Sequence, residues 1–199
     1  MKDKETAEVY RHKVEILSEL ENLSENRLID LYYGDESRVS LEPCIPYGWQ
    51  FADEEVFMPT AKGNGLNCFA LLTRNNQCLI ETSSETLTGQ FIFEQFENLS
   101  VRLRKLTVVV LDNARIHTSR IIKERIKTWQ QRGLYIFYLP RYSPHLNIVE
   151  TLWRKLKYEW LTPADYQSRE NLFYQTNSAL KAVGSSLFIQ FSKFRLTLS

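Results

Sequence analysis

The sequence lacks the features of secreted, disulfide-stabilised or membrane-embedded proteins. It has only three cysteines, Cys44, Cys68 and Cys78, widely spaced and without a CxxC pair, which argues against a disulfide framework and a zinc site. The first residues are charged, unlike a secretory signal, and no apolar run approaches the ~20 residues of a membrane helix. We find no repeat and no low-complexity linker. These absences favour a protein of the reducing cytoplasm.

The composition is that of a folded protein with an uneven distribution of charge. The 199 residues are 43% hydrophobic and 13% aromatic, enough for one domain with a real core. The net charge is +1, but residues 1–100 hold 8 basic and 18 acidic side chains, and residues 101–199 hold 17 and 6. A basic half is typical of proteins that contact phosphate backbone. Two solvated faces of opposite sign would give the same counts.

Hydrophobic periodicity predicts helices and strands that alternate along the chain. The expected helices are residues 2–23, 86–103, 118–132, 147–160 and 163–183. The expected strands are residues 27–34, 66–73, 77–82, 106–111 and 134–139, with short strands around Trp49 and at 56–58; residues 188–198 fit either a helix or a strand. The unbroken apolar run at 106–111 predicts a central strand covered on both faces. This order indicates a mixed α/β sandwich with one central sheet.

Three acidic residues stand where a carboxylate is structurally awkward. Asp35 closes the first predicted strand and shares a face with its apolar residues, whereas Asp30 and Glu36 fall on the opposite face and are poorer candidates. Asp112 ends the most buried strand, where open α/β sheets place their ligands. Glu150 lies in the first turn of a helix. These positions suggest a site rather than a surface.

Each acid also has an ordinary explanation. Gly34-Asp35 and Asp112-Asn113 are common turn pairs, and Asn147 with Glu150 matches a helix capping box. Taken together, the three acids also have a chemical explanation, because Mg²⁺ prefers carboxylate oxygens and two such ions can promote reactions at a phosphate. If the two strands are neighbours, all three carboxylates meet at one edge of the sheet. Without a cation such a cluster would repel itself.

Three segments resemble the blocks of a known enzyme family. LYYGDES, VVVLDNARIHTS and FYLPRYSPHLNIVETLWRKLKYEWL are similar to bacterial insertion-sequence transposases related to mariner elements, in order across residues 28–160. The resemblance implies an RNase H-like fold, a mixed central sheet of about five strands flanked by helices, with an Asp-Asp-Glu triad. It makes Asp35, Asp112 and Glu150 the catalytic metal ligands, the last two 38 positions apart. Trp49 resembles a Gly-x-Trp feature of the family, whereas Ile148 and His145 depart from its usual Pro and acidic residues.

The resemblance also suggests a domain organisation and a set of DNA contacts. Residues 1–26 would form a helix packing on or leading into the core, 27–162 the catalytic domain and 163–199 a C-terminal helical extension. Arg154 and Lys157 share a helix face with Glu150 and, with Arg141 and His117, are candidates for binding DNA phosphates. His117 could orient a ligand of the site instead of a phosphate. A solvated basic helix face, or a capping or packing histidine, would account for the same residues. The sequence alone does not separate these alternatives.

The implied function is metal-dependent cleavage of DNA at transposon ends, followed by transfer of the freed 3′-hydroxyl to target DNA. Two Mg²⁺ or Mn²⁺ ions would serve as cofactors, and the partners would be DNA and a second copy of the chain, in the bacterial cytoplasm at the nucleoid. Only one helix precedes Asp35, so a helix-turn-helix unit that recognises the ends would lie in another polypeptide or a missing N-terminal region. The alternatives are a repair-type RNase H-like nuclease and an inactive remnant that serves as a DNA-binding or oligomerisation module.

Overall fold

The computed structural model describes residues 2–42 and 65–194. The strands expected around Trp49 and at 56–58, and Cys44, lie outside the described residues. The helices are α1 (Lys2–Glu25), α2 (Gly89–Ser100), α3 (Arg120–Gln131), α4 (Val149–Lys155) and α5 (Arg169–Ala182), with the 3-10 helices η1 (Pro144–Leu146) and η3 (Pro163–Gln167) and the π-helix η2 (Leu156–Trp160). The strands are β1 (Asp30–Val39), β2 (Leu66–Leu72), β3 (Cys78–Ser83), β4 (Thr107–Leu111) and β5 (Leu134–Tyr138).

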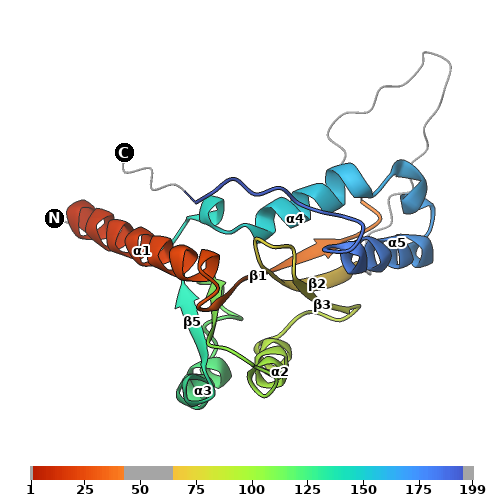
Figure 1. The fold of residues 1–199 in the computed structure, drawn as a ribbon. Helices are drawn as coiled ribbons and strands as arrows, with labels where there is room; N and C mark the ends of the chain where they lie inside the picture. Colours follow the sequence, from red (N-terminus) through yellow and green to blue (C-terminus); the bar gives the residue numbers. More distant parts are fainter. Residues whose placement is uncertain (1, 43–64, 195–199) are drawn as a thin grey trace.

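The five strands form one mixed sheet in the order β3-β2-β1-β4-β5 (Figure 1). β2 runs antiparallel to both of its neighbours, whereas β1, β4 and β5 are parallel. The first and fourth strands are therefore adjacent, so the segments that follow them share one edge of the sheet. This confirms the predicted mixed sheet of about five strands flanked by helices.

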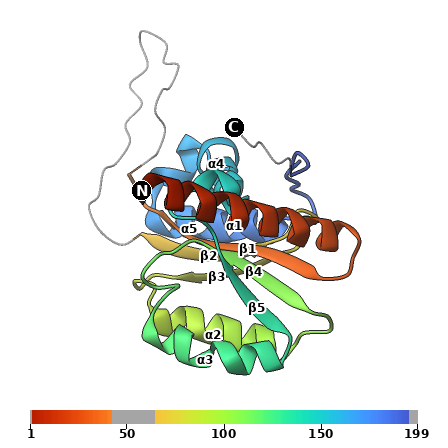
Figure 2. The same cartoon turned by 90° about the vertical axis from the view of Figure 1, so that its left-hand side faces the viewer.

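Helices cover both faces of the sheet. Figure 2 shows α2 and α3 below it and α1, α4 and α5 above it. All five residues of β4 are buried, as expected for a central strand. The largest buried side chains on the α2–α3 side include Phe96 and Trp129. The other side contains Tyr33 and Leu17 with apolar residues from α4 and α5. None of the helices in the described ranges combines the length and apolar character that crossing a membrane requires.

The structure corrects the predicted bounds of two elements, the first strand and the helix that follows Asn147. β1 begins at Asp30 and continues to Val39, rather than spanning 27–34. Its start is late because α1 extends to Glu25 and Arg27, with φ of 59°, turns the chain. Its end is late because β2 pairs with it up to Val39. The helix predicted for 147–160 begins at Val149 and changes to π geometry at Leu156.

The segment 188–194 contains neither the helix nor the strand that its pattern allowed. Its backbone is held by a side chain instead: the Asn76 amide donates to the carbonyl of Ile189 at 3.0 Å and accepts from its N–H at 2.7 Å. Arg74 donates to the carbonyl of Ser192 and, through Nε, to the buried carboxylate of Glu21 on α1 at 2.7 Å. The β2–β3 turn thus links α1 to the segment 188–194.

Glu97 joins α2 to α3 by accepting hydrogen bonds from Arg125, Arg132 and the indole N–H of Trp129. The hydrogen bonds from Arg125 and Arg132 are the main cause that holds the pKa of Glu97 well below its ordinary value. Because the folded-state pKa is depressed, this carboxylate stabilises the fold above the unfolded-state pKa of about 4.3 and less at lower pH.

Glu97→Gln should therefore lower the free energy of unfolding by about 2 kcal/mol at pH 7, the scale of a hydrogen bond to a charged group. The difference from the unmodified protein should shrink as the pH falls below about 4.3. Urea titrations at several pH values would measure it, with Glu94→Gln on the exposed side of α2 as the control. A pH-independent difference would contradict this account.

Candidate active site

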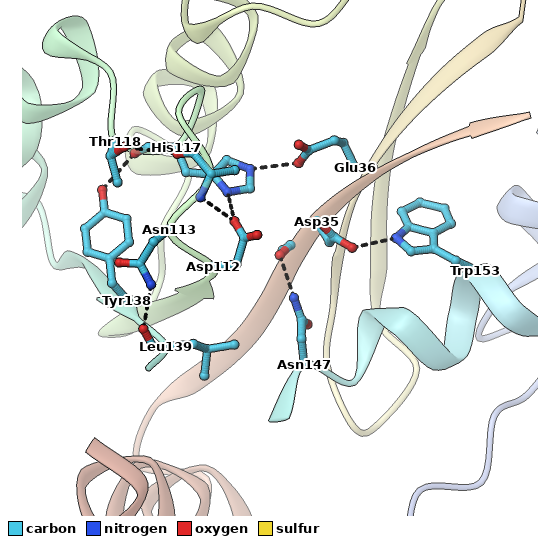
Figure 3. Close-up of polar contacts among 12 residues, drawn as sticks. Asp35, Glu36, Asp112, Asn113, His117, Thr118, Tyr138, Leu139, Asn147 and Trp153 are labelled. Carbon is cyan, nitrogen blue, oxygen red and sulfur yellow. Dashed lines mark hydrogen bonds and ion pairs between the residues drawn. The ribbon is translucent and has the colours of Figure 1, made fainter. Parts of the chain in front are cut away.

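Asp35 lies inside β1, not at its end as the sequence suggested. It pairs with Ala70 of β2, but on the other side the pairing with β4 ends at Tyr33. Asp35 therefore borders the space beyond the carboxyl end of β4. Its Oδ2 accepts a hydrogen bond of 3.1 Å from the indole N–H of Trp153 on α4 (Figure 3).

Gly34 does not form the turn that its pairing with Asp35 suggested; it is a buried strand residue. An added Cβ would lie 2.7 Å from a methyl carbon of Leu111 and 2.8 Å from one of Leu71. Glycine is needed here because neighbouring strands pack their side chains against the α2–α3 face of β1. Close packing before Asp35 thus leaves the next side chain on the α4 face.

Asp112 follows directly after β4 and is held by two contacts at Oδ1. The backbone N–H of Ala114 donates at 2.9 Å, and Nδ1 of His117 lies 2.8 Å away. The first contact is that of an aspartate turn, so the ordinary explanation also holds. Asn113 next to it donates to the carbonyl of Leu139 at 2.7 Å. The turn after β4 is thereby attached to the end of β5.

Glu150 lies in the first turn of α4, exposed to solvent. The capping box expected with Asn147 does not form, because the Asn147 N–H donates to the carbonyl of Pro144 at 2.8 Å. The Asn147 side chain instead donates to the carbonyl of Gly34 at 3.1 Å and accepts from Val149 N–H at 3.2 Å. Asn147, which the sequence indicated only as a cap, therefore fixes the start of α4 against β1.

The three acids meet in one cavity of about 510 Å³ at this edge of the sheet. Asp35 comes from β1, Asp112 from the end of β4 and Glu150 from α4, and the segment from Leu139 to Pro144 forms part of the wall. Figure 3 shows Asp35 and Asp112 on neighbouring strands with α4 beside them. The convergence predicted from the sequence is present.

Electrostatic interactions in the cavity shift the pKa values of Asp35 and Asp112. Burial is the largest cause that raises the pKa of Asp35 to about 7, and the charges of Glu36, Glu150 and Asp112 raise it further. The pKa of Asp112 is lowered, chiefly by its contact with His117 and against the effect of partial burial. The charged form of Asp35 is thus disfavoured chiefly by burial, and the neighbouring carboxylates add to this effect.

His117 was predicted to contact DNA phosphates, and the structure corrects this. The side chain is 0% exposed, so no phosphate reaches it. Nδ1 faces Asp112 and Nε2 lies 3.0 Å from Oε2 of Glu36, close enough for an ion pair although not aligned as a hydrogen bond. Burial opposes protonation of His117, but the two carboxylates outweigh it and raise its pKa to about 9. His117 orients Asp112.

Sequence reasoning missed Glu36 as the second partner of His117. Strand alternation placed it on the face opposite Asp35, which holds, and that face is where His117 lies. A histidine five positions after Asp112 was the available signal, but only the fold brings it to β1. Trp153 is a further residue of the site: its side chain is buried, and its indole N–H donates to Asp35.

The donor set suits a hard divalent cation. Asp35, Asp112 and Glu150 line one cavity from three elements, and a bound cation would offset both the burial of Asp35 and the repulsion from Glu150 and Asp112 that together raise its pKa. Within residues 2–42 and 65–194, however, no three His, Cys, Asp or Glu side chains are close enough to hold one ion as they stand. The side chains fit the chemistry of the ion and would have to move together to bind it.

Basic side chains adjoin the acids. Arg141 is exposed and lines the cavity, and Arg154 and Lys157 line a neighbouring groove of about 560 Å³ that shares Glu150 with it. Lys155 on the same helix is paired with Glu159 at 2.6 Å. Arg141 therefore lines one of the two cavities that Glu150 borders, and Arg154 and Lys157 line the other.

A mixed five-stranded sheet flanked by helices, with one acid inside β1, one directly after the adjacent parallel strand β4 and one on α4, defines an RNase H-like domain. The chain belongs to the DDE superfamily of endonucleases, whose family model, "DDE superfamily endonuclease", matches residues 30–173. No curated protein has a significantly similar sequence.

Several solved structures share the fold. The Mos1 transposase catalytic domain with raltegravir and Mn has a TM-score of 0.54 and 15% identity, covering 87% of this chain and 80% of that one. The Mos1 paired-end complex with the left transposon end has a TM-score of 0.53 and 15% identity, covering 89% and 60%. A simian T-cell lymphotropic virus intasome has a TM-score of 0.54 and 12% identity, covering 80% and 50%. This chain thus spans about three fifths of the Mos1 chain in its paired-end complex.

Proposed function

We propose that the chain is the catalytic domain of a DNA transposase of the bacterial insertion-sequence class related to mariner elements. The observation that carries this proposal is the convergence of Asp35, Asp112 and Glu150 on one cavity. The Mos1 structures with a transposon end and with Mn support DNA and a divalent cation as ligands.

Asp35, Asp112 and Glu150 would hold two Mg²⁺ or Mn²⁺ ions, which supply activation of the attacking oxygen and stabilisation of the leaving oxygen. His117 holds Oδ1 of Asp112 and Trp153 holds Oδ2 of Asp35, so two of the three carboxylates are oriented by buried side chains. Such supporting contacts keep ligands in place when the ions bind.

In the proposed reaction, a water oxygen bonds to phosphorus at the transposon end and the bond to the 3′-oxygen breaks, leaving a free 3′-hydroxyl. That hydroxyl then attacks a phosphodiester of target DNA in the same cavity: its oxygen bonds to the target phosphorus, the bond from that phosphorus to the target's own 3′-oxygen breaks, and the target strand leaves with a free 3′-hydroxyl. Arg141 on one side and Arg154 and Lys157 on the other bind phosphates of the substrate. No step attaches DNA to the protein.

The further partners are part of this proposal. A homodimer would bring two ends together, and a helix-turn-helix unit outside this sequence would recognise them. The chain alone should then bind DNA weakly and with strong salt dependence, since only phosphate contacts are available to it.

A substrate panel tests the proposed function. Purified protein is incubated with supercoiled plasmid, linear duplex, an RNA–DNA hybrid and a four-way junction, in Mn²⁺ or in EDTA. We expect Mn²⁺-dependent nicking of plasmid and duplex and none in EDTA. Preference for the hybrid or junction would indicate a repair-type nuclease. Absence of both cleavage and Mn²⁺ binding would indicate an inactive DNA-binding remnant.

A further inference from the structure

Tyr142 has no role in the fold, yet it stands at the cavity that holds the three acids. Its side chain is 97% exposed, more than any other large hydrophobic side chain in residues 2–42 and 65–194. It lines the same cavity as Asp35, Asp112 and Glu150. The exposed tyrosine ring therefore offers a large flat face to a ligand that enters the cavity.

The backbone of Tyr142 is also in a disfavoured conformation. Its φ is 58°, the left-handed region that bulky residues avoid and that glycine or asparagine adopts with less strain. Strained residues persist where the surroundings fix them, and they cluster at functional sites. Here the strain is not compensated by burial of the ring.

Contacts on both sides of Tyr142 fix this conformation. Before it, Leu139 is held by its N–H to the carbonyl of Leu111 at 2.8 Å and by Lys13 Nζ at its own carbonyl at 3.2 Å. After it, the hydroxyl of the buried Ser143 donates to the carbonyl of Arg141 at 3.2 Å, and the backbone carbonyl of Ser143 accepts from the N–H of Leu146 at 3.1 Å. These contacts hold the backbone on both sides of Tyr142, so the point from which the ring projects into solvent is fixed.

We infer that Tyr142 is a stacking platform for an unpaired nucleobase next to the phosphate that enters the cavity. The inference rests on the proposed function and specifies its substrate: DNA whose bases are separated near the cleavage site. An exposed ring stacks on any base, because every base has a flat π-face. Arg141, the preceding residue, is exposed on the same wall and provides a cation for the phosphate of that nucleotide.

Fluorescence of 2-aminopurine tests the inference. A duplex with a short single-stranded overhang that carries one 2-aminopurine is titrated with the protein in Ca²⁺, and its quenching reports stacking. Tyr142→Asn keeps a residue suited to the left-handed backbone and removes the ring. It should abolish the quenching and weaken binding roughly 10- to 100-fold, while Tyr142→Phe and Tyr142→Trp restore both. Tyr174→Ala, on the exposed side of α5, is the matched control.

The outcomes separate this inference from the proposed function. Unquenched fluorescence with the unmodified protein, or equal quenching with Tyr142→Asn, overturns the stacking platform even if plasmid nicking in Mn²⁺ is normal. Loss of dimerisation in Tyr142→Asn without a change in DNA binding assigns the ring to a protein contact and also overturns it. Absence of Mn²⁺-dependent nicking in the unmodified protein overturns the proposed function itself. The melting temperature of Tyr142→Asn, expected to be unchanged or higher, excludes unfolding as the cause.

Discussion

Asp112→Asn and Glu150→Gln should each lower the rate of Mn²⁺-dependent DNA cleavage roughly 1000-fold while the fold remains intact. A bound cation lowers the free energy of the charged transition state by several kcal/mol. If the loss of one ligand removes about 4 kcal/mol of this stabilisation, the rate falls by this factor. Both side chains are exposed and outside the hydrophobic core. The asparagine can still accept from the Ala114 N–H, so the turn after β4 should persist.

Matched controls are available outside the cavity. Asp30→Asn alters an acid at the start of β1 that pairs with Lys105, and Glu159→Gln alters one after α4 that pairs with Lys155. Both controls should cleave DNA normally. Circular dichroism and melting curves of the four variants would establish folding. Full activity in Asp112→Asn or Glu150→Gln would remove that residue from the proposed ligand set.

His117→Ala should weaken Mn²⁺ binding roughly 10- to 100-fold, the usual cost of losing a residue that orients a ligand. It should also destabilise the fold by about 1–3 kcal/mol, because Glu36 loses its partner inside the protein. Isothermal titration with Mn²⁺ measures the first effect and urea unfolding the second. His12→Ala, on the exposed side of α1, is the control.

A double-mutant cycle shows whether His117 and Glu36 act as one unit. Residues in direct contact are non-additive, so Glu36→Gln should add little to the loss of Mn²⁺ affinity in His117→Ala. If His117→Ala lowers only stability and leaves Mn²⁺ affinity and the cleavage rate unchanged, the histidine is a packing residue. Additive losses would mean that Glu36 acts independently of it.

The fold was largely predictable, and the errors have local causes. The run at 106–111 predicted β4 correctly because complete burial leaves a continuous apolar signature. The end of β1 was wrong because residues Asp35 to Val39 are not apolar enough to signal a strand; pairing with β2 extends it. The segment 188–194 was undecided because Asn76, over a hundred positions earlier, satisfies its backbone.

The residues of the site were also predicted only in part. Strand alternation correctly separated Asp35 from Glu36, because side-chain direction in a strand depends only on position along it. The sequence left open whether His117 orients a phosphate or a ligand, because the burial that excludes the phosphate is a property of the whole fold. No pattern in its neighbourhood indicated that β1 would place Glu36 against the far side of its ring.

The sequence alone determined most of the helices and strands and their order, and it singled out Asp35, Asp112 and Glu150, because these signals lie within short windows of the chain. The tertiary structure decided that β1 lies between β2 and β4, and with it the meeting of Asp35, Asp112 and Glu150 in one cavity. It also decided that His117 is buried and that Tyr142 is exposed. These features depend on strand pairing and packing between residues far apart in the chain, which local patterns do not encode.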